Sequence, residues 1–294
     1  MKYGIADPER LGQAELSDGR KTGWAEWGPE DGTPVLLFSG AGMSRWLGFG
    51  KDTVAARGIR LIALERPGLG SSDPDPGRTL ESWVADVREF VRLRDLGGVS
   101  GSRRGVAVVG FSQGAPFALA CAAAGVARAV AIVSGQDELL HPAFADDLDP
   151  HLRGMLQAVA ADPDGFAASF EKQADAEGLW RLIVSMSSDQ DRAVYTDPAF
   201  AEHYRRALAE GFSQGPAGYV RDLLVTMSPW PFDVADITVP VDLWYGGHDT
   251  STVHSPDHGA TLALRIPTAR RRLLPEAGGS LLWTHAEDIL TALT

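Results

Sequence analysis

The feature that most constrains this chain is the pentapeptide Gly110-Phe111-Ser112-Gln113-Gly114, because of the two segments that flank it. Residues 106–109 before it are apolar and mostly β-branched, as in a buried strand. Residues 115–124 after it are small and apolar, which favours a helix. A strand, a G-x-S-x-G turn and a helix in this order form a nucleophile elbow, which exposes the serine hydroxyl on a sharp turn. Ser112 is therefore the candidate nucleophile, and it needs a base to accept its proton.

The same five letters recur at residues 211–215, where the context differs. Residues 201–210 before them have a helical pattern, and Pro216 follows them directly. No strand leads into this second copy, so the pattern predicts the end of a helix followed by a turn. Ser213 is accordingly not a candidate nucleophile, since the motif counts only in its strand–turn–helix context.

Composition narrows the possible partners. The net charge of −12 over 294 residues disfavours unaided binding to nucleic acid or to an anionic membrane surface. The single cysteine, Cys121, cannot form an internal disulfide, and no apolar run reaches the roughly 20 residues of a membrane span. The N-terminal residues lack the pattern of a signal peptide. We therefore expect a cytoplasmic protein that acts on a small molecule without cofactor or metal; the sequence does not determine its oligomeric state.

Short apolar strands alternate with helical segments, which is typical of a mostly parallel sheet covered by helices. The predicted strands are residues 21–27, 34–39, 59–64, 106–110, 129–134, 241–246 and 271–274, the first of them paired in a hairpin that turns at Asp18-Gly19. The predicted helices of this core are residues 44–56, 80–93, 113–124, 256–265 and 281–293.

The alternation stops between residues 137 and 235, where the pattern is almost entirely helical. Helices are predicted there at residues 150–160, 165–174, 179–187, 198–210 and 217–227. A helical insertion between two core strands suggests a lid over a pocket. The expected organisation is thus a core of residues 1–136 and 236–294 with a cap at residues 137–235.

Together with the elbow, further motifs along the chain resemble those of the α/β-hydrolase family, and the resemblance covers nearly the whole chain. Residues 65–73, Glu-Arg-Pro-Gly-Leu-Gly-Ser-Ser-Asp, are similar to its R-P-G-x-G-x-S loop, and Gly246-Gly247-His248-Asp249 is similar to the turn that carries its acid. The resemblance implies an α/β-hydrolase fold: a mostly parallel twisted sheet with helices on both faces and a helical lid. It also implies Ser112 as nucleophile and Asp249 as the acid of a triad.

The family's oxyanion loop, His-Gly-x-Pro, is replaced here by Ser39-Gly40-Ala41-Gly42. Because an oxyanion hole uses backbone N–H groups, we still expect Ala41 and Gln113 to supply it. The rigidity of the loop is less assured, since Gly42 stands where proline is usual.

The family's catalytic histidine follows the last strand, and that position is Gly279 in this chain. His285, six residues later, is the candidate base retained here, although its helical position also suits a structural role. His248 would have to bend back over the turn that carries Asp249. His254 and His258 form an H-x-x-x-H string, but Pro256 between them disfavours a shared helix face and a metal site.

The resulting functional hypothesis is hydrolysis of a small ester or lactone through Ser112 with an atypical triad. Two alternatives stay open because of the missing histidine. One is a non-hydrolytic lyase or cyclase of the same fold, and the other is a catalytically silent protein that binds a small molecule. Fold alone does not decide among them.

Overall fold

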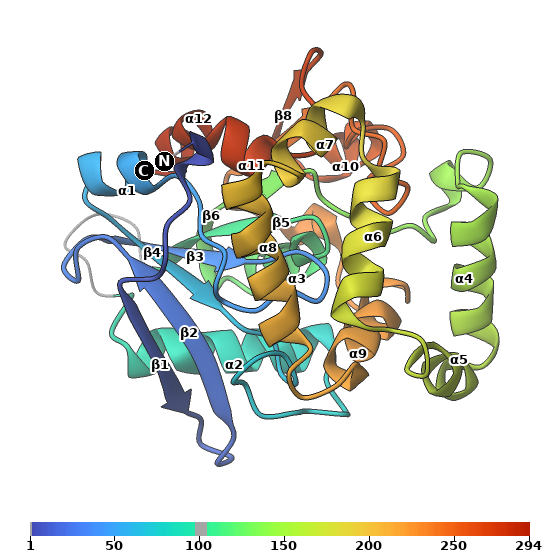
Figure 1. The fold of residues 1–294 in the computed structure, drawn as a ribbon, viewed down its shortest axis with the longest axis horizontal. Helices are drawn as coiled ribbons and strands as arrows, with labels where there is room; N and C mark the ends of the chain where they lie inside the picture. Colours follow the sequence, from blue (N-terminus) through green and yellow to red (C-terminus); the bar gives the residue numbers. More distant parts are fainter. Residues whose placement is uncertain (1, 98–104) are drawn as a thin grey trace.

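The strands form one twisted sheet at the centre of the molecule (Figure 1). The structure is a computed structural model that describes residues 2–97 and 105–294. Within these residues eight strands are ordered β1-β2-β4-β3-β5-β6-β7-β8, with antiparallel pairing of β1 with β2 and of β2 with β4 and parallel pairing elsewhere. The strands are β1 (Arg10–Glu15), β2 (Lys21–Trp27), β3 (Thr33–Phe38), β4 (Ile59–Leu64), β5 (Val106–Phe111), β6 (Ala127–Val133), β7 (Val241–Gly246) and β8 (Ala269–Leu274).

Helices cover both faces of this sheet. Those of the core are α1 (Lys51–Ala56), α2 (Leu80–Leu93), α3 (Gly114–Ala123), α10 (Ala260–Arg265), α11 (Leu281–Thr284) and α12 (Ala286–Leu293). Figure 1 shows α1 and α12 on one face and α2 and α3 on the other. Among the described helices, none combines the length and hydropathy that crossing a bilayer requires.

The alternation of side chains along the parallel strands explains this layering. In β3, Val35 and Leu37 belong to the core under α1 and α12, whereas Leu36 and Phe38 belong to the core under α2 and α3. Successive residues of a strand point to opposite faces. A strand that is apolar at every position must therefore be covered on both sides, as the sequence of these strands predicted.

Six further helices lie between β6 and β7: α4 (Pro150–Ala161), α5 (Pro163–Phe170), α6 (Ala176–Met186), α7 (Asp189–Tyr195), α8 (Pro198–Gly211) and α9 (Ala217–Thr226). They extend from the centre of Figure 1, where α8 stands, to its right-hand edge, where α4 and α5 lie. Most begin at an aspartate or serine whose side chain accepts a hydrogen bond from the first turn, as Asp175 does from the N–H of Gly178. Such caps stabilise helix N-termini and fix where each helix begins.

Most predicted elements are confirmed, and the differences have local causes. The helix predicted at residues 44–56 begins only at Lys51, because Gly50 adopts a positive φ of 65°. The helix predicted at 281–293 is interrupted at His285, whose φ and ψ are −129° and 30°. The short polar helix α7 was missed, since its sequence has no apolar periodicity.

Candidate active site

The G-x-S-x-G turn forms a strained elbow at the carboxyl end of β5. Ser112 has a positive φ of 51°, which is costly for a residue with a side chain. The turn is held because the Ser112 N–H donates to the carbonyl of Val133 and the Ser112 carbonyl accepts from the N–H groups of Ala115 and Gln136. A side chain at Gly114 would collide with the carbonyl of Phe38, so the glycine is required sterically. The strand-turn-helix prediction is confirmed here.

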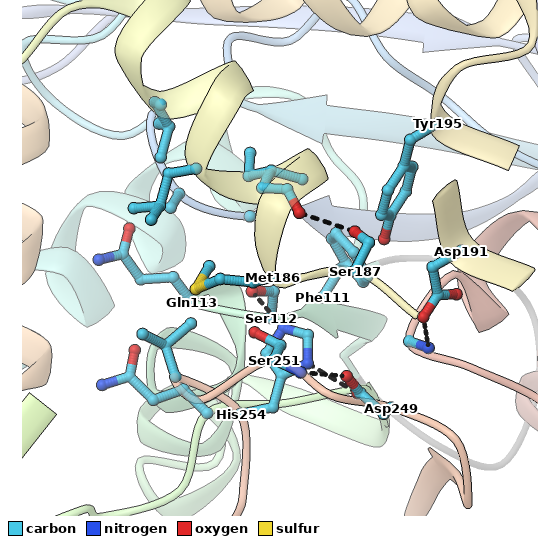
Figure 2. A pocket seen from close by; sticks show the side chains of 18 of the residues that line it. Phe111, Ser112, Gln113, Met186, Ser187, Asp191, Tyr195, Asp249, Ser251 and His254 are labelled. Carbon is cyan, nitrogen blue, oxygen red and sulfur yellow. Dashed lines mark hydrogen bonds and ion pairs between the residues drawn. The ribbon is translucent and has the colours of Figure 1, made fainter. Parts of the chain in front are cut away.

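An imidazole connects the elbow to the end of β7. The Ser112 hydroxyl lies 2.9 Å from Nε2 of His254, and Nδ1 of His254 lies 2.7 Å from Oδ2 of Asp249 (Figure 2). All three side chains are buried. Since an ionised carboxylate only accepts hydrogen bonds, the proton is on Nδ1 and the lone pair of Nε2 faces the serine hydroxyl. The arrangement can therefore remove the proton from the hydroxyl of Ser112.

The segment after β7 bends so that it brings Asp249 and His254 together. The N–H of Ser251 donates to Oδ1 of Asp249 at 3.0 Å, and the N–H of His254 donates to the carbonyl of Ser251 at 3.3 Å. Directly after the imidazole, the N–H of Ser255 donates to the carbonyl of Gly135 at 2.9 Å. His254 is thus fixed from both sides, and it precedes helix α10, as the position of Pro256 suggested.

The structure does not bring His285 to the serine hydroxyl, which corrects the sequence expectation. His285 lies at the break between α11 and α12, and its Nδ1 contacts the hydroxyl of Thr284 at 3.0 Å. It borders a different surface hollow from the one that contains Ser112. His248 is also elsewhere, with Nδ1 at 3.1 Å from the amide of Gln190. Sequence reasoning missed His254 because it was weighed only as a metal ligand.

Gly279 lies beside the carboxylate of Asp249. A Cβ atom added at Gly279 would come within 2.8 Å of Oδ1 and 2.9 Å of Oδ2 of Asp249. The backbone here is held by Asp191 of α7, whose carboxylate accepts from the N–H groups of Gly279 and Ser280 at 2.8 Å each. The loop after β8 is therefore tied to the helical insertion and carries no imidazole.

Ala41 and Gln113, the residues expected to form the oxyanion hole, line the same cavity as Ser112. Within the described chain, neither backbone N–H donates in the turns and loops. The guanidinium of Arg66 donates to the carbonyls of Ser39 and Gly40 at 2.7 and 2.8 Å. In a trans peptide the N–H points opposite to the C=O, so this contact directs the Ala41 N–H away from Arg66. The two N–H groups can hold an oxyanion.

Arg66 is itself held by a buried charge network. Its Nε donates to Asp222 of α9 at 2.7 Å, and the other oxygen of that carboxylate accepts from Arg78. All three side chains are fully buried. The network links the loop after β3 to the helical insertion, and this contact supplies rigidity to a loop in which Gly42 replaces the usual proline.

The second G-x-S-x-G copy packs against the same loop. Helix α8 ends at Gly211, which confirms the prediction of a helix terminus. A side chain at Gly211 would collide with the carbonyl of Gly42, and the amide of Gln214 donates to the carbonyls of Gly70 and Ser72 at 2.8 Å. These residues therefore support neighbouring loops.

The cavity above Ser112 is mainly apolar and is walled by the helical insertion. Its apolar residues include Leu179, Ile183 and Met186 of α6 and Leu223 of α9. Within the described chain, no three or more histidine, cysteine, aspartate or glutamate side chains are grouped to bind a metal ion.

Comparison with known proteins identifies the family of this chain. A model of the alpha/beta hydrolase family matches residues 35–292. The chain belongs to this family. It is 32% identical to a non-heme chloroperoxidase of Streptomyces lividans over 111 residues, a stretch that spans 35% of this chain and only 36% of that relative.

Solved structures share the fold over almost the full chain. A hydrolase from Pseudomonas aeruginosa superposes with a TM-score of 0.69 at 18% identity, covering 97% of this chain and 98% of that one. An esterase from Rhodococcus gives 0.64 at 16% identity over 97% and 99% of the two chains. An enol-lactonase from Burkholderia xenovorans gives 0.66 at 15% identity over 96% and 97%. At such identities the likeness concerns the fold alone.

Proposed function

We propose that this chain hydrolyses small esters or lactones, with Ser112 as nucleophile, His254 as base and Asp249 as the group that orients the base. The observation that carries the proposal is the hydrogen-bonded series from the serine hydroxyl through both imidazole nitrogens to the carboxylate. The fold shared with an esterase and an enol-lactonase favours ester chemistry further. In this proposal the base is His254, in the loop after β7, instead of a histidine in the loop after β8.

In the first half of the reaction, Oγ of Ser112 attacks the carbonyl carbon while its proton passes to Nε2 of His254. Asp249 keeps the imidazole in the required tautomer and stabilises the imidazolium that forms. The tetrahedral oxyanion receives hydrogen bonds from the N–H groups of Ala41 and Gln113. His254 then returns the proton to the leaving alkoxide, and the acyl group stays on the serine.

In the second half, His254 takes a proton from water, and the hydroxide attacks the acyl carbon. The serine oxygen leaves and recovers its proton, and the carboxylic acid is released. With a lactone the alkoxide of the first half belongs to the same molecule, so the product is a hydroxy acid. Helices α4–α9 act in this proposal as the cap that shields the acyl-enzyme from bulk solvent.

The direct test is intact-mass analysis after exposure to a fluorophosphonate, together with hydrolysis of p-nitrophenyl butanoate. Ser112→Ala and His254→Ala should lose labelling, and kcat should fall by about 10⁴-fold or more in each, as for other triads. His285→Ala is the matched control, since it removes an imidazole that does not contact the elbow. It should retain wild-type labelling and activity within about twofold.

Two results would overturn the proposal. If the His285 variant lost activity and the His254 variant retained it, His254 would not be the base. Absence of labelling and turnover in folded wild-type protein would instead favour the alternatives of lyase chemistry or simple ligand binding. Ligand-induced thermal stabilisation without conversion would identify the latter.

A further inference from the structure

Three tyrosines project into the cavity from three different helices of the insertion. Tyr195 ends α7, Tyr204 lies within α8 and Tyr219 within α9, and all three line the cavity that contains Ser112. Each residue is 4–6% exposed. Figure 2 shows the oxygen-bearing end of Tyr195 pointing into the cavity from the side opposite His254 and Asp249. All three rings are thus buried, and their residues border the space that a substrate would occupy.

The three hydroxyl groups have no partner in the protein. Within the described residues, none of them donates or accepts a hydrogen bond, and each oxygen keeps some accessible surface. The fourth buried tyrosine, Tyr245, behaves differently, since its hydroxyl donates to the carbonyl of Gly135 at 3.1 Å and lies outside the cavity. An accessible hydroxyl can bond to solvent, and a ligand that displaces this solvent must supply a new partner or leave the hydroxyl unpaired at a cost in free energy. The three hydroxyl groups around one cavity are therefore available to an acceptor on a bound ligand.

Aromatic packing holds these rings rigidly. The centroids of Tyr195 and Tyr204 are 5.5 Å apart, and both rings pack on Trp283, at 6.1 and 5.9 Å. Tyr219 packs on Phe212 at 5.3 Å. Such contacts fix the rings at little further entropic cost when a ligand binds.

The charge of the cavity restricts the ligand further. Burial raises the pKa of all three phenols above the ordinary value, so each remains a neutral donor at physiological pH. The described lining includes the carboxylates of Asp191 and Asp249 but no lysine or arginine. An anionic substrate would meet negative charge without a counter-ion, and this disfavours its binding.

We propose that Tyr195, Tyr204 and Tyr219 select neutral substrates that carry, besides the scissile carbonyl, a second oxygen able to accept hydrogen bonds. This inference rests on the proposed ester or lactone hydrolysis. The ligand class is an alkoxy- or oxo-substituted ester or lactone whose hydrocarbon part fits the apolar wall of α6. A plain hydrocarbon acyl chain leaves the phenols unpaired and is the poorer substrate.

The test compares p-nitrophenyl methoxyacetate and 3-methoxypropanoate with the butanoate and pentanoate of matching chain length. For each enzyme, the oxygen preference is the kcat/KM of the methoxy ester divided by the kcat/KM of the matching hydrocarbon ester. Dividing the wild-type preference by that of each Tyr→Phe variant cancels the intrinsic reactivity of the esters. We expect the preference to fall about three- to tenfold in at least one of Tyr195→Phe, Tyr204→Phe and Tyr219→Phe. Tyr245→Phe is the control and should change both members of a pair by the same factor.

An anionic arm uses the p-nitrophenyl hemiester of succinic acid, for which we expect a kcat/KM at least tenfold below that of the neutral pentanoate. An unchanged oxygen preference in all three variants, or hemisuccinate turnover equal to that of the pentanoate, would overturn the inference. Ser112→Ala is assayed in parallel. If its activity is lost while the tyrosine variants leave the preference unchanged, the substrate class is wrong and the hydrolytic function stands.

Discussion

Replacing Gly279 by alanine tests how closely the acid is confined. The added Cβ would lie 2.8 Å from Oδ1 and 2.9 Å from Oδ2 of Asp249, whereas ordinary contact begins at 3.4 Å. The carboxylate would therefore have to move by about 0.5 Å. It cannot move freely, because Oδ2 holds His254 at 2.7 Å and Oδ1 accepts from Ser251 at 3.0 Å. Gly279 has no positive φ, so backbone strain does not contribute.

The size of the effect follows from this displacement. A 1 Å misplacement at a reacting centre costs about 10²-fold in rate, so about 0.5 Å should lower kcat roughly tenfold, or about 1.4 kcal/mol. KM should change little, because the perturbed hydrogen bond strengthens only as the imidazole becomes charged. The overpacked site should also lower the free energy of unfolding by about 1–3 kcal/mol.

The assay is the kcat of p-nitrophenyl butanoate hydrolysis, measured with urea unfolding of the same preparations. Gly154→Ala, within α4, is the matched control, because a Cβ there meets nothing within 4 Å. It should leave kcat unchanged and raise the unfolding free energy by up to about 1 kcal/mol. A Gly279→Ala enzyme with kcat within twofold of wild type would refute the reasoning.

Three further predictions concern residues around the site. Asp222→Asn leaves Arg66 without its buried carboxylate, and we expect the free energy of unfolding from urea titration to fall by about 3–5 kcal/mol; a loss below 1 kcal/mol would contradict this. Ser213→Ala should keep full fluorophosphonate labelling by mass spectrometry, because the second G-x-S-x-G copy only supports loops; reduced labelling would contradict that role. Burial raises the pKa of Asp137 to about 6, so its contribution to stability is fully present below pH 4 and is lost as the pH rises through 6. Asp137→Asn mimics the protonated form, and its unfolding free energy relative to wild type should therefore rise by up to about 3 kcal/mol between pH 4 and pH 7; a flat difference would contradict the shift.

The sequence predicted those features that depend on local patterns. Apolar strands, the elbow at Ser112 and the helical stretch before β7 could be recognised because strand and helix periodicities differ and because the motif has a defined context. The end of α8 at Gly211 could likewise be predicted from its preceding helix.

The position of His254 could not be predicted in this way. It lies in an irregular segment, whose path depends on hydrogen bonds to Asp249 and Gly135 rather than on any periodicity. The sequence did contain one signal, the short distance between the two residues. His254 comes five residues after Asp249, and a loop of this length can fold a side chain back onto an acid at the end of a strand. His285 had the more regular position but lies at a helix break that separates it from the elbow.

The bond between Asp191 and the backbone of Gly279 and Ser280 has a further consequence for how this chain can vary. With the imidazole supplied from residue 254, the segment after β8 is released from providing a reactive group. The constraint on residue 279 is then steric and no longer chemical, because its side chain must be small enough to leave the Asp249 carboxylate in place. The segment is then available as an anchor for α7, and through this anchor the helical insertion is tied to the end of β8.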